Sequence, residues 1–187
     1  NSFLEVSTGF CWNPSSLHGF GANAEQLLAK AREQAANMLG VNPAEIIFTS
    51  GGSESNNLAI KGAALQYKGR GKHIITSSIE HPSVLNPTEQ LKDLGYEITY
   101  LPVDEDGRVC VNQLKEAIRE ETILVSIMHI NNEIGSIQPI EEIGELLKQY
   151  PKILFHVDGV QGYSKVNLSL SRSHVDLYSL SGHKIHG

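Results

Sequence analysis

The residues best able to do chemistry follow apolar runs in this sequence. Ser-Gly-Gly-Ser at 50–53 follows one run, His81 follows the next, and Asn132, Asp158 and Lys184 follow later ones. A lysine amine can bond covalently to an aldehyde, and a carboxylate can pair with a cationic ring. Free N–H groups at a Gly-rich helix start can hold a phosphate. The sequence therefore offers sites for an aldehyde, a ring cation and a phosphate.

Each of these signals also has an ordinary structural explanation. Gly-Gly-Ser turns are common in loops, a histidine before a proline often caps a helix, and an aspartate after a strand often caps a helix or pairs with a cation. The segment 50–55 lacks the Gly-Lys-Ser/Thr of a P-loop. A metal could use His129, Glu133, His156 and Asp158, but we expect no metal site. The sequence contains no His-x-x-x-His pair and no set of cysteine ligands.

The elements that must position these residues alternate between helix and strand patterns. Helices are predicted at 23–40, 54–69, 80–95, 111–120 and 139–150, and strands at 45–50, 73–78, 96–103, 122–130, 152–158 and 175–181. Asn23 is expected to cap the first helix, and Gly40 to end it. Apolar strands separated by helices predict an α/β fold, with a mostly parallel sheet covered by helices on both faces. Ligands of such sheets bind at the carboxyl ends of the strands, where the polar residues lie.

Length, charge and cysteine content narrow the class of protein. The chain has 187 residues, which suits one domain over 1–187. A formal net charge of −6 argues against a nucleic-acid-binding or anionic-membrane surface. No apolar run is long enough to span a bilayer. Cys11 and Cys110 form no disulfide framework, so we expect reduced thiols in a cytoplasmic protein.

Together, the candidate groups indicate one kind of ligand. A phosphate cradle, an aspartate, an amide, a histidine and a lysine are all predicted at one edge of one sheet. Pyridoxal 5'-phosphate (PLP) needs a lysine for its aldehyde, an acid for its pyridinium nitrogen and an anchor for its phosphate. The sequence therefore predicts PLP as the cofactor.

Several stretches resemble the NifS/IscS-type cysteine desulfurases, within the class-V aminotransferase-like group of fold-type I PLP enzymes. The resemblance is carried by EIIFTSGGSESNNLAIKG, HIITSSIEHPSV, ILVSIMHINNEIGSIQPI, FHVDGVQGYSKV and DLYSLSGHKIHG, in the order and spacing of the family. It implies the large PLP-binding domain of that fold, which resembles aspartate aminotransferase.

The resemblance also implies roles around the cofactor ring. Lys184 would bond covalently to the cofactor and later transfer a proton, and Asp158 would pair with the pyridinium nitrogen. Gln161 would hydrogen-bond the phenolic oxygen, and Asn132 would lie beside the ring. His81 would stack on the ring and act in acid–base steps. The expected catalytic residues are thus Lys184 and His81.

The phosphate would be held by residues from two parts of the chain. Gly52 and Ser53 would bind it through N–H and hydroxyl groups, joined by Ser181 and His183. Ser53 stands where the family usually has threonine, which keeps the hydroxyl. Gly159 stands where alanine is common, which would loosen the turn under the ring.

Parts of the family pattern have no counterpart in 1–187. The family opens with a segment like YLDNAATTP, and it continues after the lysine into the rest of the sheet and a smaller C-terminal domain. That later half carries the sulfur-accepting cysteine and the arginine that binds the substrate carboxylate. Cys11 and Cys110 match neither catalytic position. We interpret 1–187 as an incomplete large domain, insufficient by itself for turnover.

The function implied by the resemblance is that of a homodimeric cysteine desulfurase. It would take sulfur from L-cysteine, give L-alanine, and pass an enzyme persulfide to an acceptor such as an iron–sulfur scaffold or a tRNA-thiolation protein. A selenocysteine lyase, a sulfinate desulfinase or another class-V aminotransferase stays open as an alternative. A non-catalytic interaction or scaffold protein is the alternative from a different class.

Overall fold

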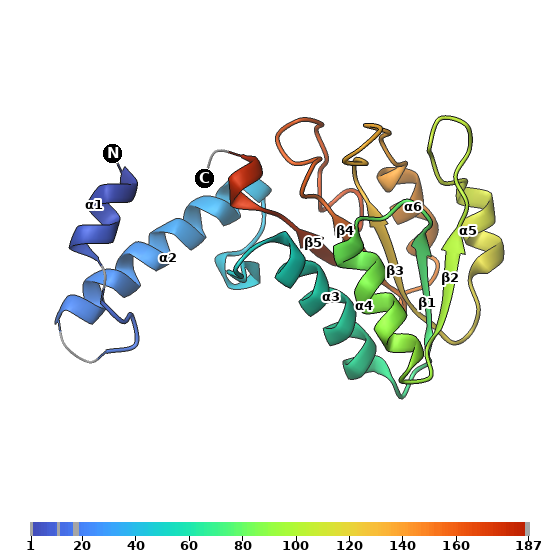
Figure 1. The fold of residues 1–187 in the computed structure, drawn as a ribbon, viewed down its shortest axis with the longest axis horizontal. Helices are drawn as coiled ribbons and strands as arrows, with labels where there is room; N and C mark the ends of the chain where they lie inside the picture. The colour runs from blue at the N-terminus through green and yellow to red at the C-terminus, as the bar shows by residue number, and fades with distance from the viewer. Residues whose placement is uncertain (1, 11, 17–18, 186–187) are drawn as a thin grey trace. The chain divides into compact units, whose positions relative to one another are not determined.

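The computed structural model describes residues 2–10, 12–16 and 19–185 (Figure 1). The chain divides into two compact units, Asn1–Phe48 and Thr49–Gly187. The single domain over 1–187 stays a prediction, and Cys11 lies outside the described residues. Among the described helices, none combines the length and apolar character that crossing a bilayer requires.

The first unit is helical. It contains α1 (Ser2–Gly9), α2 (Gly19–Leu39) and a short 3-10 helix, η1 (Pro43–Glu45). Because α2 already begins at Gly19, the prediction that Asn23 caps it is wrong, and Asn23 lies within the helix. Gly40 follows the last helical residue with φ of +68°, which confirms the predicted end of the helix.

The strand predicted at 45–50 does not form. Asn42 and Glu45 make a reciprocal capping box around η1, and 46–49 have no regular secondary structure. The apolar side chains there remain open to solvent, with Ile47 71% and Phe48 48% exposed. A β-branched run becomes a strand only where a neighbouring strand takes its N–H and C=O groups, and no strand of the described chain pairs with this segment.

The second unit contains a five-stranded sheet in the order β2-β1-β3-β4-β5. The strands are β1 (His73–Ser77), β2 (Glu97–Leu101), β3 (Thr122–Met128), β4 (Leu154–Asp158) and β5 (Leu177–Ser179). Every neighbouring pair is parallel, which confirms the predicted parallel sheet. The chain order reverses between β1 and β3, so a crevice forms there at the carboxyl ends.

Helices cover both faces of this sheet, as predicted. On one face lie α3 (Gly52–Tyr67) and α4 (Pro82–Lys92), drawn in front of the sheet in Figure 1. Ile60 of α3 and Val84 of α4 pack in one cluster with Ile74 of β1 and Leu124 of β3. On the other face lie α5 (Val111–Ala117) and α6 (Ile140–Leu147).

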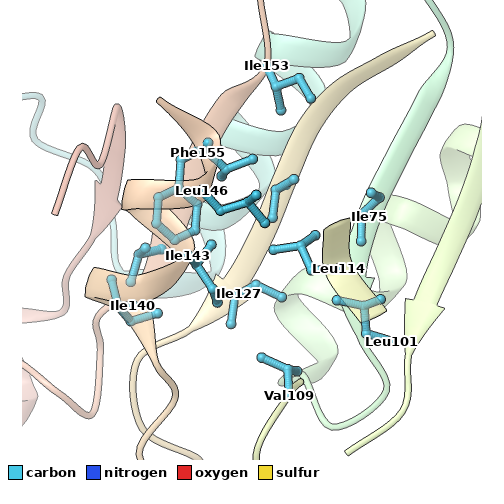
Figure 2. Close-up of a cluster of buried hydrophobic side chains, with 13 residues drawn as sticks. Ile75, Leu101, Val109, Leu114, Ile127, Ile140, Ile143, Leu146, Ile153 and Phe155 are labelled. Carbon is cyan, nitrogen blue, oxygen red and sulfur yellow. The ribbon is translucent and has the colours of Figure 1, made fainter. Parts of the chain in front are cut away.

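The larger core lies between the sheet and helices α5 and α6 (Figure 2). Phe155 of β4 and Ile127 of β3 contribute to it from the sheet, and Ile143 and Leu114 contribute from the helices. Each of these side chains is at most 1% exposed. Burying one such side chain contributes about 1.5–3 kcal/mol to folding. This core fixes β3 and β4, whose carboxyl ends lead to candidate site residues.

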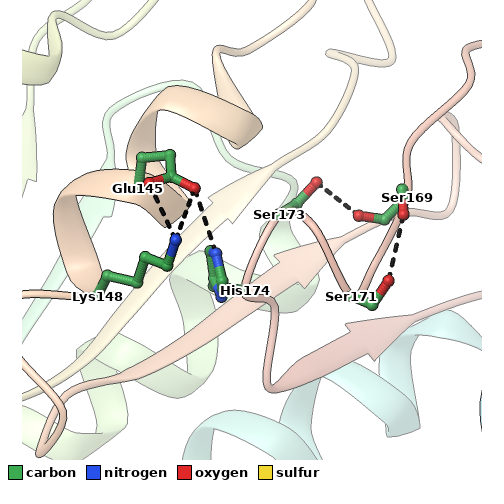
Figure 3. A network of polar contacts seen from close by, with 6 residues as sticks. All are labelled: Glu145, Lys148, Ser169, Ser171, Ser173 and His174. Atoms are coloured by element: carbon green, nitrogen blue, oxygen red, sulfur yellow. Dashed lines mark hydrogen bonds and ion pairs between the residues drawn. The ribbon is translucent and has the colours of Figure 1, made fainter.

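The segment between β4 and β5 is held against α6. Glu145 accepts bonds from Lys148 and from the His174 ring, and Ser173 donates to the carbonyl of Ser169 (Figure 3). Gly144 permits this close approach, since a Cβ there would lie 1.9 Å from the Ser173 carbonyl oxygen. The segment that leads from Asp158 to Lys184 is thereby tied to the core.

Candidate active site

A cavity of about 290 Å³ opens at the carboxyl ends of β1, β3, β4 and β5. It is lined by every residue that the sequence predicts for the site: Gly52, Ser53, His81, Asn132, Asp158, Gln161, Ser181, His183 and Lys184. These residues come from separate segments, and the parallel topology brings them together. The described residues contain no cluster of His, Cys, Asp and Glu suited to a metal ion.

Sequence reasoning missed some residues of this site. Ser83, Met128 and Val160 complete the lining of the cavity. Ser83 lies two residues after His81 and contacts its ring. The sequence His-Pro-Ser could have predicted this contact. Met128 and Val160 read as core residues in the sequence, and only the register of β3 and the turn after β4 bring them to the cavity.

The start of α3 forms one wall of the cavity. The helix is capped by Gly51, which has no side chain to bond the N–H groups of the first turn. These N–H groups therefore have no side-chain partner at the end of the helix that borders the cavity. Gly52 is needed because a Cβ there would lie 2.8 Å from Cγ2 of Val160. With the dipole of α3 adding positive potential, this wall suits an anion.

Asp158 is a buried acid, only 6% exposed, at the end of β4. Its Oδ1 accepts the N–H of Val160 at 3.0 Å, and its Oδ2 accepts from Nδ2 of Asn56 at 2.7 Å. Burial raises the pKa of Asp158, while these two donors and the nearby His81 oppose the rise. Acceptance at both oxygens is the bonding of an ionised carboxylate, so the site presents an anion to the cavity.

His81 caps the N-terminus of α4 beside this acid. Its Nδ1 accepts the backbone N–H of Ser83 at 3.1 Å and lies 2.7 Å from the Ser83 hydroxyl oxygen. The ring is exposed and lines the cavity. The capping role and the site role are therefore combined in one side chain.

Lys184 lies in the 3-10 helix η2 (Gly182–Lys184), just after β5. Its side chain is exposed and lines the cavity. Ser181 and His183 of the same segment are joined by a hydrogen bond of 2.8 Å between Oγ and Nδ1. The amine, a hydroxyl and an imidazole thus reach the cavity from one short segment.

The turn after Asp158 rests on an aromatic side chain. A Cβ on Gly159 would lie 2.1 Å from Cζ of Tyr178, and a Cβ on Gly162 would lie 2.0 Å from Nδ1 of His129. Tyr178 fills the space that an alanine at 159 would need, so the expected loosening at Gly159 is compensated by this ring. Gln161 of the turn faces the cavity and accepts from Lys165 at 3.0 Å.

A second buried acid, Glu80, joins the ends of β1 and β3. Its Oε1 accepts the hydroxyl of Ser77 at 2.6 Å and the N–H of Met128 at 2.9 Å. Burial raises the pKa of Glu80 to about 8, and the charge of Asp158 adds to the rise. At neutral pH Glu80 is therefore mostly protonated, and Asp158 carries the negative charge of the pair.

Beneath the cavity, His156 links three strands to α3. Its ring nitrogens lie 2.8 Å from Oγ of Ser126 and 3.0 Å from Oγ of Ser179. Ser55 of α3 donates to Ser179 at 2.9 Å. Burial lowers the pKa of His156 to about 4, so the ring is neutral in the folded protein at neutral pH.

Acid is expected to weaken the fold through His156. Because the unfolded state takes up a proton near pH 6.5 and the folded state only near 4, stability falls as pH falls through this window. The loss from pH 7 to pH 5 is about 2 kcal/mol for this residue. Urea unfolding at both pH values tests this. His156→Gln should be less stable at pH 7 but lose less on acidification; an equal loss in both proteins would contradict the prediction.

Comparison with known proteins identifies the family of this chain. The Aminotransferase class-V family profile matches residues 3–187. The chain is 51% identical over 185 residues to the cysteine desulfurase IscS of Dictyoglomus turgidum, covering 99% of this chain and 46% of that protein. It is 54% identical over 187 residues to a NifS/IcsS protein homolog of Lactobacillus delbrueckii subsp. bulgaricus, covering 100% and 49%.

Solved structures agree with these relatives. A structure of SspA in complex with cysteine has a TM-score of 0.94 at 42% identity, covering 100% of this chain and 53% of that one. A NifS-like protein gives a TM-score of 0.94 at 42% identity, covering 98% and 51%. The chain thus spans about half the length of the relatives it matches. Since the family profile covers nearly all of it, this chain belongs to the class-V aminotransferase family.

Proposed function

We propose that the protein containing this chain is a PLP-dependent cysteine desulfurase. It takes the sulfur of L-cysteine and releases L-alanine. The observation that supports this most is the convergence of the predicted residues on one cavity, with the carboxylate of Asp158 buried beside it. The relatives named above as cysteine desulfurase and NifS-like proteins support the choice of reaction within the family.

The donor set of the cavity fits PLP. The wall at the start of α3 suits its phosphate, and the anion of Asp158 suits its pyridinium nitrogen. Lys184 reaches the same cavity from a different segment and suits its aldehyde. Other members of the lining present hydroxyl, amide and imidazole groups for its remaining polar atoms: Ser53, Asn132, Gln161, Ser181 and His183. An anion site, a buried carboxylate and an exposed amine in one cavity are the features this cofactor requires.

The residues of the chain then have separable tasks. When bound, PLP supplies an electron sink for the carbon that bears the substrate amino group. Asp158 holds the ring nitrogen in its charged form, and Gly52 and Ser53 orient the phosphate. Lys184 would retain the cofactor and, when its amine is free, transfer a proton through Nζ. His81 faces the substrate from the start of α4.

The wider setting belongs to the same proposal. The enzyme works as a homodimer in the cytoplasm, and it passes its sulfur to an acceptor protein such as an iron–sulfur scaffold. The sulfur-accepting cysteine is not assigned to this chain, because Cys110 is not among the residues that line the cavity and Cys11 matches no catalytic position of the family.

The test uses the full-length enzyme, purified with PLP. With L-cysteine and a thiol reductant, it should form L-alanine and sulfide in equal amounts, since the enzyme thiol takes the sulfur as persulfide and the reductant releases it. An enzyme that gave a keto acid in place of alanine would be an aminotransferase. One that acted on L-selenocysteine alone would be a selenocysteine lyase. Either result would overturn the proposal.

A further inference from the structure

A continuous set of hydrogen bonds connects Asp158 to His81. Asp158 Oδ2 accepts from Nδ2 of Asn56 at 2.7 Å, and the same Nδ2 donates to Oγ of Ser83 at 2.9 Å. Oγ of Ser83 lies 2.7 Å from Nδ1 of His81. Neither Asn56 nor Ser83 is needed by the cofactor assignment above.

The direction of these bonds follows from the chemistry of their ends. The carboxylate of Asp158 can only accept, so Asn56 must turn its NH₂ group toward it. The same NH₂ group donates to Ser83. Asn56 is fully buried, and its Oδ1 has no hydrogen-bond partner within the described part of the chain. The Asn56 amide therefore donates to both Asp158 and Ser83, while its oxygen is left without a hydrogen bond.

The proton of the neutral His81 ring can be placed in the same way. The backbone N–H of Ser83 points at Nδ1 from 3.1 Å, and an N–H group can only donate. Since Oγ of Ser83 already accepts from Asn56, its own hydrogen is free to be donated to Nδ1. Two donors from one residue thus converge on Nδ1. A proton on Nδ1 would oppose both of them and the positive end of α4.

We infer that Asn56 and Ser83 are positioning residues that connect Asp158 to His81 and hold His81 as a neutral imidazole with its proton on Nε2. His81 then presents the N–H group of Nε2 to the cavity that it lines. The negative charge of the nearby Asp158 favours a second proton on the ring, while the two donors at Nδ1 and the positive end of α4 oppose it. A neutral histidine held at a helix N-terminus is an established way to stabilise developing negative charge.

This inference rests on the proposed function, because that function places the substrate beside His81. Its test does not depend on turnover. The full-length enzyme is labelled with ¹⁵N-histidine, and the His81 signals are assigned by their loss in His81→Gln. At neutral pH, Nδ1 should resonate as an unprotonated nitrogen that accepts hydrogen bonds, and Nε2 as a protonated one. A protonated Nδ1, with or without a proton on Nε2, would overturn the inference.

The variant Ser83→Ala tests the serine itself. Removing the hydroxyl should shift the Nδ1 resonance downfield, because Nδ1 loses one of its two donors. Ser83→Thr keeps the hydroxyl and should restore the original shift. An unchanged Nδ1 resonance in Ser83→Ala would show that the serine does not position the ring. Absence of sulfide release with the predicted ¹⁵N pattern would count against the proposed function alone.

Discussion

Replacing Asp158 with asparagine is expected to lower the turnover of L-cysteine on the order of 10²–10³-fold. Asparagine has nearly the same shape but no charge, so it cannot hold a pyridinium nitrogen in its protonated form. The exchange also disturbs the bonds at the acid. Both oxygens of Asp158 accept N–H groups, from Val160 and Asn56, and an amide offers only one oxygen. One NH₂ group would then face another donor, at a cost of about 1–3 kcal/mol.

The measurement is steady-state sulfide release together with the absorbance spectrum of bound PLP. Asp106→Asn is a suitable control, since it removes the same charge from an exposed turn. The control should keep normal turnover. If Asp158→Asn retained turnover within about tenfold of the unaltered enzyme, the acid would have no electrostatic role in the site.

Replacing Gly159 with alanine is expected to destabilise the fold by about 1–3 kcal/mol and to displace the turn that carries Gln161. The new Cβ would lie 2.1 Å from Cζ and 2.4 Å from the hydroxyl oxygen of Tyr178, so either the ring or the turn must move. Tyr178 cannot retreat freely, because it packs against the large core and its hydroxyl lies 3.4 Å from Nδ1 of His129.

A double-mutant cycle separates this clash from other effects. In a Tyr178→Leu background the space is open, and the added cost of Gly159→Ala should disappear. Gly62→Ala is the matched control, since nothing lies within 4 Å of its Cβ position on α3 and the change should gain up to about 1 kcal/mol. Equal costs of Gly159→Ala in both backgrounds, read from urea unfolding, would refute the pairing of Gly159 with Tyr178.

The sheet and most helices could be predicted because their sequence signals are local. Strands β1, β3 and β4 are almost wholly buried and consist mostly of apolar and β-branched residues, and the helices between them set the parallel order. The prediction at 45–50 failed because a strand also needs a pairing partner, which no local pattern reveals. Asn23 was misjudged as a cap because many polar residues could begin that helix.

The cavity could be predicted because strand ends in a parallel sheet share one edge, so residues as distant as His81 and Lys184 were expected together. The supporting contacts could not be predicted. Asn56 and Ser83 are ordinary polar residues in the sequence, and their bonds to Asp158 and His81 depend on how α3 and α4 lie on the sheet. The fit of Tyr178 against Gly159 likewise depends on the register of β4 and β5.

Mapping the covalent attachment of PLP tests the central claim most directly. The full-length enzyme with bound PLP is reduced with borohydride, digested, and examined by peptide mass spectrometry, with Lys184→Ala as the control. The predicted result is a pyridoxyl group on Lys184 and none in the control. Attachment to another lysine, such as Lys165 beside Gln161, or no attachment at all, would contradict the assignment of this cavity as the cofactor site.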